Sequence, residues 1–348
     1  GSAVAVQVGD VLDRGGEEIA LYYWLSRLQR QAAAAGGALH VLLGNHEAMG
    51  AMADFRYATP EAYGEFARWA RVRALELSLL GRCGCCGADE AKLRAAQNRE
   101  REREEEKERE KREESERGQP PTSWYQRLLS SASASPSAPS STPLPPPHPA
   151  LWAARMRELW EAPGKKARRM ALAAGSGELA ERFLAPCPVA LQVGSSLFVH
   201  GGVLPQHAAL GLAEINAQTR KWLLHGLPRE APFFLKGRDA VVWLRRYSWE
   251  ESASCECATL QQALDLVPGA RRMVVGHTIQ SQGINAACDG KVFRVDVGLS
   301  KGCADGAPEA LEIRDDAVAR RVNEPRVRGW LLDKLWKPGG GGPVPVAA

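Results

Sequence analysis

Four short polar motifs, each directly behind an apolar run, carry the side chains of this sequence that could do chemistry. The motifs are GDVLDRG at 9–15, GNHE at 44–47, HGG at 200–202 and GH at 276–277. The apolar runs that precede them are 4–8, 39–43, 197–199 and 273–275, respectively. Charges at the end of a buried strand need partners that neutralise them. We therefore interpret the aspartate, asparagine and histidine side chains of these motifs as metal ligands.

The elements around the first two motifs predict how their side chains meet. Residues 17–35 have the pattern of a helix, with Leu21, Leu25 and Leu28 at helical spacing and a glycine pair at 36–37 to end it. A helix between two apolar strands predicts a β-α-β unit with parallel strands. Asp10 and Asn45 then follow neighbouring strands at the same sheet edge, which is where open α/β sheets build their sites.

The motifs together resemble those of the calcineurin-like metallophosphoesterases. The segments GDVLDRG, LLGNHE, FVHGG and VVGHT occur in this order, and DRG with GNHE is typical of the phosphoprotein phosphatase type. Further segments, DFRYATPEAYGEF, VVWLRRYS, VVGHTIQ and RVDVGLSKG, are similar to the Shewanella-like branch. One short motif is weak evidence, whereas an ordered set is specific. The resemblance implies an α/β fold, a calcineurin-like β-sandwich flanked by helices.

The resemblance also implies a metal site. Asp10 would bridge two divalent ions, and Asn45, His200 and His277 would complete the second of them. Two metals about 3.5–4 Å apart neutralise phosphoryl oxygens and activate water. A mixed set of oxygen and imidazole ligands suits manganese, with iron or zinc as alternatives, better than calcium or magnesium.

Catalytic roles follow from the same motifs. His46 would be the general acid toward the leaving group, and Asp13 would hold its imidazole ring. Arg14 would clamp the phosphoryl group. Arg245 matches the position of a second clamp, with Arg246 as its competitor.

One family motif does not occur in the sequence. Members of the family carry an earlier strand that ends in Gly-Asp-x-His and supplies an aspartate and a histidine to the first metal, whereas this chain begins Gly-Ser and reaches a strand at once. We expect either a chain without its first strand or a true loss of half the metal site. Of the first metal's ligands, only Asp10 would then remain.

Composition divides the chain into four segments. Residues 1–87 and 151–336 read as two parts of one metallophosphoesterase domain, with a loose tail at 337–348. Between them, residues 88–150 read as an insertion: a charged helix rich in Arg, Lys and Glu, then a Ser- and Pro-rich tract that should be disordered. The interleaved glutamates cancel the positive charge, which disfavours nucleic-acid binding by the helix.

The net charge, the length of the apolar runs and the cysteine positions limit the partners and the compartment that we expect for this protein. A formal charge of +4 over 348 residues implies no general attraction to nucleic acid or to anionic membranes, and no apolar run approaches the roughly 18 residues of a membrane span. Of eight cysteines, the cluster Cys83, Cys85 and Cys86 is expected to be free thiols in a reducing compartment, with a metal site or a redox pair as alternatives. We expect a chloroplast or cytoplasmic protein, and the oligomeric state stays open.

Several other side chains are expected to be structural. A histidine at a strand end is usually a hydrogen-bonded structural residue. The side chains that we assign to this class are His40, His148, His207, His225 and Asp296. The aromatic residues Tyr57, Tyr63, Phe66 and Trp69 are expected in the core, with the substrate groove as the alternative.

Three functions are consistent with these residues. The first is a metal-dependent phosphoprotein phosphatase that hydrolyses phosphoserine or phosphothreonine, with phosphotyrosine as a further option, by attack of metal-bound water. The second keeps the fold but takes a nucleotide or another small phosphate ester. The third is a non-catalytic binding module, which the missing first strand motivates.

Overall fold

The computed structural model describes residues 3–82 and 164–323. The chain divides into two compact units, Gly1–Arg68 with Ala162–Ala348, and Trp69–Glu161. The predicted insertion at 88–150, the tail at 337–348 and the cluster at Cys83 lie outside the described residues. Of the helices predicted at 151–183, only the part from residue 164 onward is described.

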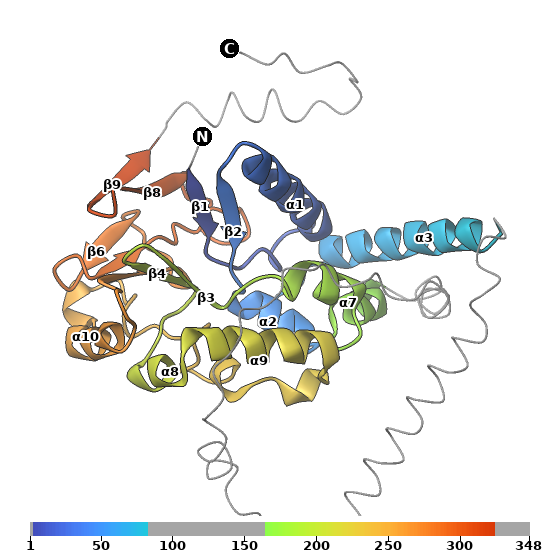
Figure 1. Cartoon of the computed structure of the whole chain (residues 1–348). Helices are drawn as coiled ribbons and strands as arrows, with labels where there is room; N and C mark the ends of the chain where they lie inside the picture. Colours follow the sequence, from blue (N-terminus) through green and yellow to red (C-terminus); the bar gives the residue numbers. More distant parts are fainter. Residues whose placement is uncertain (1–2, 83–163, 324–348) are drawn as a thin grey trace, which may run out of the picture. The chain divides into compact units, whose positions relative to one another are not determined.

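The predicted β-α-β unit opens the first compact unit. Strand β1 (Val4–Gln7) pairs in parallel with β2 (Ala38–Val41), and helix α1 (Glu18–Ala34) connects them. In Figure 1, α1 lies beside the two strands. Leu25 is buried as the helical spacing suggests, but Leu21 is 39 % exposed. The buried face of α1 instead uses Glu18, Ile19 and Tyr22, because it also contacts the charged groups described below.

The sequence pattern predicts helix over 51–80, with a new helix that opens at Pro60. The structure has α3 (Pro60–Arg82) there, and before it a short helix, α2 (Asn45–Ala51), that begins inside the GNHE motif and was not predicted. Thr59 caps α3, since its Oγ1 accepts a hydrogen bond from the Ala62 amide. Helix α7 (Gly164–Leu172) and the π-helical turn η1 (Ala180–Leu184) follow after the gap.

A five-stranded sheet carries the other two motifs. Its strands, in spatial order, are β3 (Ala190–Val193), β4 (Ser196–Val199), β5 (Arg272–Val275), β7 (Val292–Arg294) and β6 (Asn285–Ala287). The hairpin β3–β4 is antiparallel as predicted, while β4, β5 and β7 are parallel. Val199 is paired with Val275, so His200 and His277 both follow the same end of the sheet. Val199 and Val275 have no exposed surface and belong to the core.

The remaining elements are short. They are helices α8 (Pro205–Leu210), α9 (Leu212–His225) and α10 (Cys257–Asp265), the 3-10 turns η2 (Pro228–Glu230), η3 (Phe233–Leu235) and η4 (Ser252–Ser254), and the hairpin β8 (Glu309–Arg314) with β9 (Val318–Asn323). The sequence predicts strands at 292–297 and 310–313, which correspond to β7 and β8, but none at β6 or β9. Together the elements form a mixed α/β fold. No helix in the described ranges is both long and apolar enough to cross a membrane.

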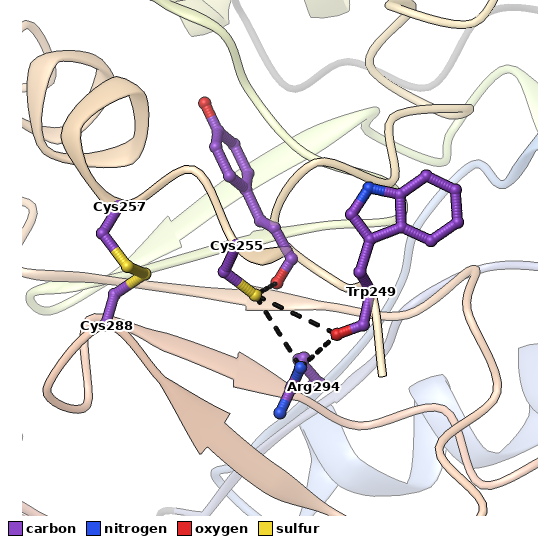
Figure 2. Close-up of a disulfide and its surroundings, with 6 residues drawn as sticks. Trp249, Cys255, Cys257, Cys288 and Arg294 are labelled. Atoms are coloured by element: carbon purple, nitrogen blue, oxygen red, sulfur yellow. Dashed lines mark hydrogen bonds between the residues drawn. A yellow bond between two sulfur atoms is a disulfide. The ribbon is translucent and has the colours of Figure 1, made fainter. Parts of the chain in front are cut away.

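A disulfide joins two cysteines for which no pairing was predicted. Cys257, at the start of α10, is bonded to Cys288, which lies between β6 and β7 (Figure 2). Beside it, Arg294 donates hydrogen bonds to the Trp249 carbonyl oxygen and to Cys255 Sγ. The spacing of these cysteines gave no signal, because folding alone brings residues 31 positions apart together. Within the described ranges, Cys187, Cys255 and Cys303 are free.

Candidate active site

The first motif adopts an unusual backbone. Asp10, Asp13 and Arg14 have φ angles of 61°, 72° and 59°, and His277 has 65°. Side-chain-bearing residues rarely adopt this left-handed region, so three of them in the first motif indicate a loop that the surrounding structure holds in place. Gly9, at φ 102°, is required as glycine, since a Cβ would lie 2.7 Å from the Gly44 Cα and 2.9 Å from His200 Nδ1.

Glu47 holds this loop. Its Oε1 accepts hydrogen bonds from the amides of Val11 (2.7 Å) and Leu12 (2.9 Å). Its Oε2 accepts from the amides of Asp10 (2.9 Å) and Gly44 (2.8 Å). One buried carboxylate therefore fixes the backbone of both motifs, GDVLDRG and GNHE. The sequence analysis assigned no role to Glu47, although its place directly after His46 in the motif was a usable signal.

Asp10, Asn45 and His200 converge as predicted. His200 Nδ1 lies 2.7 Å from the Val8 carbonyl oxygen, which can only accept, so Nδ1 carries a proton. Nε2 then faces Asn45 Oδ1 at 2.9 Å and Asp10 Oδ2 at 3.2 Å. Burial lowers the pKa of His200, but the charge and hydrogen bond of Asp10 raise it more. These facing atoms can be satisfied by a proton on Nε2 or, with the neutral ring, by a cation between them.

His277 completes this cluster. Within the described ranges its Nε2 is buried and has no hydrogen-bond partner. Burial, together with the charges of His200 and Arg245, lowers the pKa of His277 to about 3, so the ring is neutral near pH 7. A neutral imidazole with an unpartnered nitrogen is the state that a metal ligand needs.

The donor set as a whole fits a divalent cation. The ligand atoms of Asp10, His200 and His277 all lie within 4.8 Å of one another, and Asn45 adds its oxygen beside them. Burial raises the pKa of Asp10, but the charge and hydrogen bond of His200 outweigh it and hold that pKa well below its usual range. The carboxylate is therefore ionised. Oxygen and imidazole donors in this number are typical of manganese, iron or zinc sites.

His46 and Asp13 form a hydrogen-bonded pair next to this cluster. His46 Nδ1 lies 2.6 Å from Asp13 Oδ2, and His46 Nε2 lies 3.8 Å from Asp10 Oδ2. Burial lowers the pKa of His46, but the hydrogen bond to Asp13 and the charge of Asp10 raise it more. The ring is held so that one nitrogen contacts Asp13 and the other faces the cluster.

Arg14 lies at the exposed side of the site. Its Nη1 donates to Cys303 Sγ at 3.2 Å, and its guanidinium lies 5.1 Å from the centroid of the Tyr57 ring. The Tyr57 ring is also 5.1 Å from the ring of His46. The expectation that Tyr57 belongs to the core is wrong, because its side chain is 39 % exposed and lies beside Arg14 and His46, whereas Phe66 is fully buried in the core as expected.

The structure separates the two competing arginines. Arg245 Nη1 donates to the His277 carbonyl oxygen (3.2 Å) and to Thr278 Oγ1 (3.0 Å), which places Arg245 at the cluster. Burial lowers its pKa. Arg246 instead forms exposed ion pairs with Asp239 and Glu256. Arg245 is therefore the arginine that can reach a ligand in the site.

The side chains expected to be structural lie elsewhere or have structural partners. Asp296 Oδ1 accepts from the Gly298 amide and so caps a turn. His207 is buried, accepts from the Leu204 amide, and has a pKa lowered to about 4 by burial. His40 lies in β2 and His225 at the exposed end of α9. His148 lies outside the described residues.

Two buried charges next to Asp13 were not anticipated. Arg168 of α7 bonds both Asp13 and Glu18, and all three side chains are buried. Asp13 and Arg168 are separated by 155 residues. A basic residue in an arginine- and lysine-rich helix gives no sequence signal for such a contact.

Comparison with known proteins identifies the relatives of this chain. Over 325 residues it is 39 % identical to Shewanella-like protein phosphatase 2 of Arabidopsis thaliana, covering 92 % of this chain and 68 % of that protein. It is 31 % identical over 152 residues to Shewanella-like protein phosphatase 1 of Plasmodium berghei (strain Anka), covering 41 % of each. No family model matches the chain.

Solved structures agree on the fold. The cold-active protein-tyrosine phosphatase of a psychrophile, Shewanella sp., superposes with a TM-score of 0.51 at 18 % identity, covering 92 % of this chain and 67 % of that one. A second structure of a cold-active protein tyrosine phosphatase, at 1.1 Å, superposes with a TM-score of 0.51 at 19 % identity, covering 89 % of this chain and 63 % of that one. The chain thus spans about two thirds of the length of these structures and of its Arabidopsis relative. Its 39 % identity to that relative shows that the chain belongs to the Shewanella-like protein phosphatases, a family of phosphatase enzymes.

Proposed function

We propose that this chain is a metal-dependent phosphoprotein phosphatase that hydrolyses phosphomonoesters of serine or threonine, with tyrosine as the second candidate substrate. One observation carries the proposal. The His46–Asp13 pair lies beside a cluster in which His200 Nε2 faces two oxygen acceptors and His277 Nε2 is unpartnered among the described residues. Such an arrangement would bring a cation and a proton donor to one point.

Asp10, Asn45, His200 and His277 would hold the cation, which we propose to be manganese, with iron or zinc as alternatives. A bound divalent ion would supply charge neutralisation for phosphoryl oxygens and an activated water. The role of the protein is to keep the four donors in place. The Val8 carbonyl oxygen accepts from His200 Nδ1 and fixes that ring, and Glu47 accepts from the Asp10 amide and fixes the loop that carries Asp10.

His46 would transfer the proton that the leaving group needs. Asp13 holds its Nδ1, and its Nε2 faces the site. As a water oxygen bonds to phosphorus and the bond between phosphorus and the ester oxygen breaks, the proton passes from His46 to that ester oxygen, so that the alcohol leaves neutral and phosphate remains. Asp13 fixes the tautomer and stabilises the protonated ring before the transfer.

Arg14 and Arg245 would bind the phosphoryl oxygens. The two guanidinium groups approach the site from the first motif and from the segment before α10. Each has N–H donors beyond its bonds to Cys303 and to Thr278. A planar guanidinium matches two phosphoryl oxygens at once. The Tyr57 ring, beside Arg14 and His46, would cover the bound ester.

The number of metals follows from the ligands. The family resemblance implies two ions bridged by Asp10, but the sequence contains no Gly-Asp-x-His motif to complete the other position. We therefore propose that Asp10, Asn45, His200 and His277 hold one ion, and that a second ion would need further ligands, which these four residues do not supply. One ion cannot fully replace two, so we expect weak turnover by this chain.

A phosphatase assay with added manganese tests the proposal. We expect slow hydrolysis of an aryl phosphate that is lost in Asp10→Asn and His46→Ala and unchanged in His225→Ala, a change at an exposed histidine on α9. Unchanged rates in both site variants would refute the proposed function. A panel of phosphoserine, phosphothreonine and phosphotyrosine peptides, with nucleotides alongside, would identify the substrate class. Preference for nucleotides would replace a phosphoprotein with a small molecule.

We propose that β1–β2 and the five-stranded sheet belong to the two-sheet sandwich of the calcineurin-like metallophosphoesterases, which a crystal structure would test. We also propose a chloroplast or cytoplasmic location, which fractionation of cells that produce the protein would test.

A further inference from the structure

Arg168 is a fully buried arginine next to the proposed proton donor. It lies in α7 (Gly164–Leu172), and its side chain has no exposed surface. Its guanidinium lies between two aromatic rings, 5.4 Å from the centroid of Phe55 and 5.0 Å from that of Phe66. Removing a charge of this kind from water requires compensating partners.

Both partners of Arg168 are acidic groups on the active-site side. Its Nη2 lies 2.7 Å from Asp13 Oδ1, and its Nη1 donates to Glu18 Oε2. Glu18 Oε1 in turn accepts from the Asp13 amide at 3.0 Å. The side chain and the backbone of Asp13 are therefore held by the same pair of residues.

The contacts continue to His46. Asp13 uses Oδ1 for Arg168 and Oδ2 for His46 Nδ1, at 2.7 Å and 2.6 Å. A carboxylate bonded at both oxygens cannot rotate about its terminal bond without losing one of its partners. Since Asp13 also adopts a left-handed backbone, its position depends on such external contacts.

We propose that Arg168 is a positioning residue for proton transfer: its planar fork fixes the Asp13 carboxylate, which fixes the His46 ring. The inference rests on the proposed function, in which His46 protonates the leaving oxygen. Because Arg168 acts through Asp13, it sets the orientation of the proton donor and takes no part in the bond-breaking step itself.

The geometry favours this role over simple stabilisation. A buried ion pair is often no more stabilising than a well-packed apolar side chain. An arginine presents its N–H groups at fixed angles in one plane, and since Nη2 contacts Asp13 while Nη1 contacts Glu18, it holds the two carboxyl groups in a fixed relation. A lysine at this position would keep the charge but could not bridge Asp13 and Glu18 in one plane.

Kinetics with two leaving groups test the inference. We expect Arg168→Met to lower kcat about 10- to 100-fold while KM stays within about threefold, as for other residues that orient an active-site group through a second side chain. The loss should be larger for phenyl phosphate, whose leaving oxygen needs the proton, than for p-nitrophenyl phosphate. In a His46→Asn background the same change should have no further effect. Arg168→Lys should recover part of the rate.

A matched control distinguishes an effect on the orientation of His46 from a general effect of removing an arginine that stacks on aromatic rings. Arg182 also stacks on aromatic rings, those of Tyr23 and Phe183, but it is exposed. Arg182→Met should leave kcat unchanged. Equal losses for the two esters, or full additivity with His46→Asn, would overturn the inference. If Arg168→Met does not fold, Arg168→Lys is subjected to the same two measurements.

Proton NMR on the metal-free chain gives a readout that does not need activity. A hydrogen-bonded imidazole N–H resonates far downfield, and His46→Asn assigns the signal. We expect this signal in the wild type and its loss or upfield shift in both Arg168 variants, at unchanged circular dichroism. An unchanged signal in both variants, or no signal in the wild type, would overturn the inference. Hydrolysis of neither ester by the wild type would refute the proposed function instead, and the NMR result would still decide the role of Arg168.

Discussion

Glu47→Gln tests how the two motifs are held together. The Glu47 carboxylate accepts four backbone amides, two on each oxygen, and also the Tyr22 hydroxyl on Oε1 at 3.2 Å. In the glutamine variant one oxygen becomes an NH₂ group, which cannot accept. At least two buried amides then lose their acceptor. Each such loss costs about 1–3 kcal/mol, so we expect a decrease of about 4 kcal/mol in the free energy of unfolding.

Urea unfolding in EDTA, followed by tryptophan fluorescence, measures this decrease without a contribution from bound metal. Glu65→Gln is the matched control, because Glu65 also accepts two backbone amides, those of Ile19 and Ala20, at 3.1 and 3.0 Å. Those bonds are more exposed, so water can replace them, and we expect a loss of about 1 kcal/mol. A Glu47→Gln protein no less stable than Glu65→Gln would refute the view that Glu47 organises the site.

Three further predictions concern groups around the site. Burial raises the pKa of Glu18 from 4.5 to about 7. Since the folded state then holds the proton more tightly than the unfolded state, the free energy of unfolding is highest below pH 4.5 and decreases by about 3 kcal/mol as the pH rises through 7. Urea unfolding at pH 5 and pH 8 should show a smaller decrease in Glu18→Gln than in the wild type. Gly9→Ala should lower the melting temperature and weaken manganese binding in a titration, because its Cβ would meet Gly44 and His200; unchanged values would contradict this. Replacing Cys257 and Cys288 by serine should cost about 3–4 kcal/mol in non-reducing urea unfolding, from the 31-residue separation, and a loss below about 1 kcal/mol would count against it.

The convergence of the motifs could be predicted in part, because the pairing of the strands follows from topology. Parallel pairing of β1 with β2 places Asp10 and Asn45 at one edge of the two-stranded sheet, and parallel pairing of β4 with β5 places His200 and His277 at one edge of the five-stranded sheet. The meeting of the two pairs also depends on the packing of the two sheets, for which the local pattern gives no signal. The β-α-β unit and the β3–β4 hairpin were predictable, since their apolar runs and helical spacing are local signals.

The supporting residues could not be predicted, because their contacts depend on packing between distant segments. Arg168 looks like an exposed residue of a basic helix, yet it is buried against Asp13. Cys257 and Cys288 carry no spacing signal. Leu21 has the spacing of a core residue but is exposed, because α1 turns Glu18 inward toward Arg168. In each case an interaction with a remote charge or strand outweighs the local pattern.

The most direct test of the account is to count the metal ions bound to this chain. Equilibrium dialysis against manganese, followed by metal analysis, should give one ion per chain in the wild type and in His225→Ala, and none in His277→Ala, which removes the unpartnered Nε2. Circular dichroism would confirm that the variants are folded. No bound ion in the wild type, or one ion retained in His277→Ala, would contradict the claim that Asp10, Asn45, His200 and His277 form a metal site.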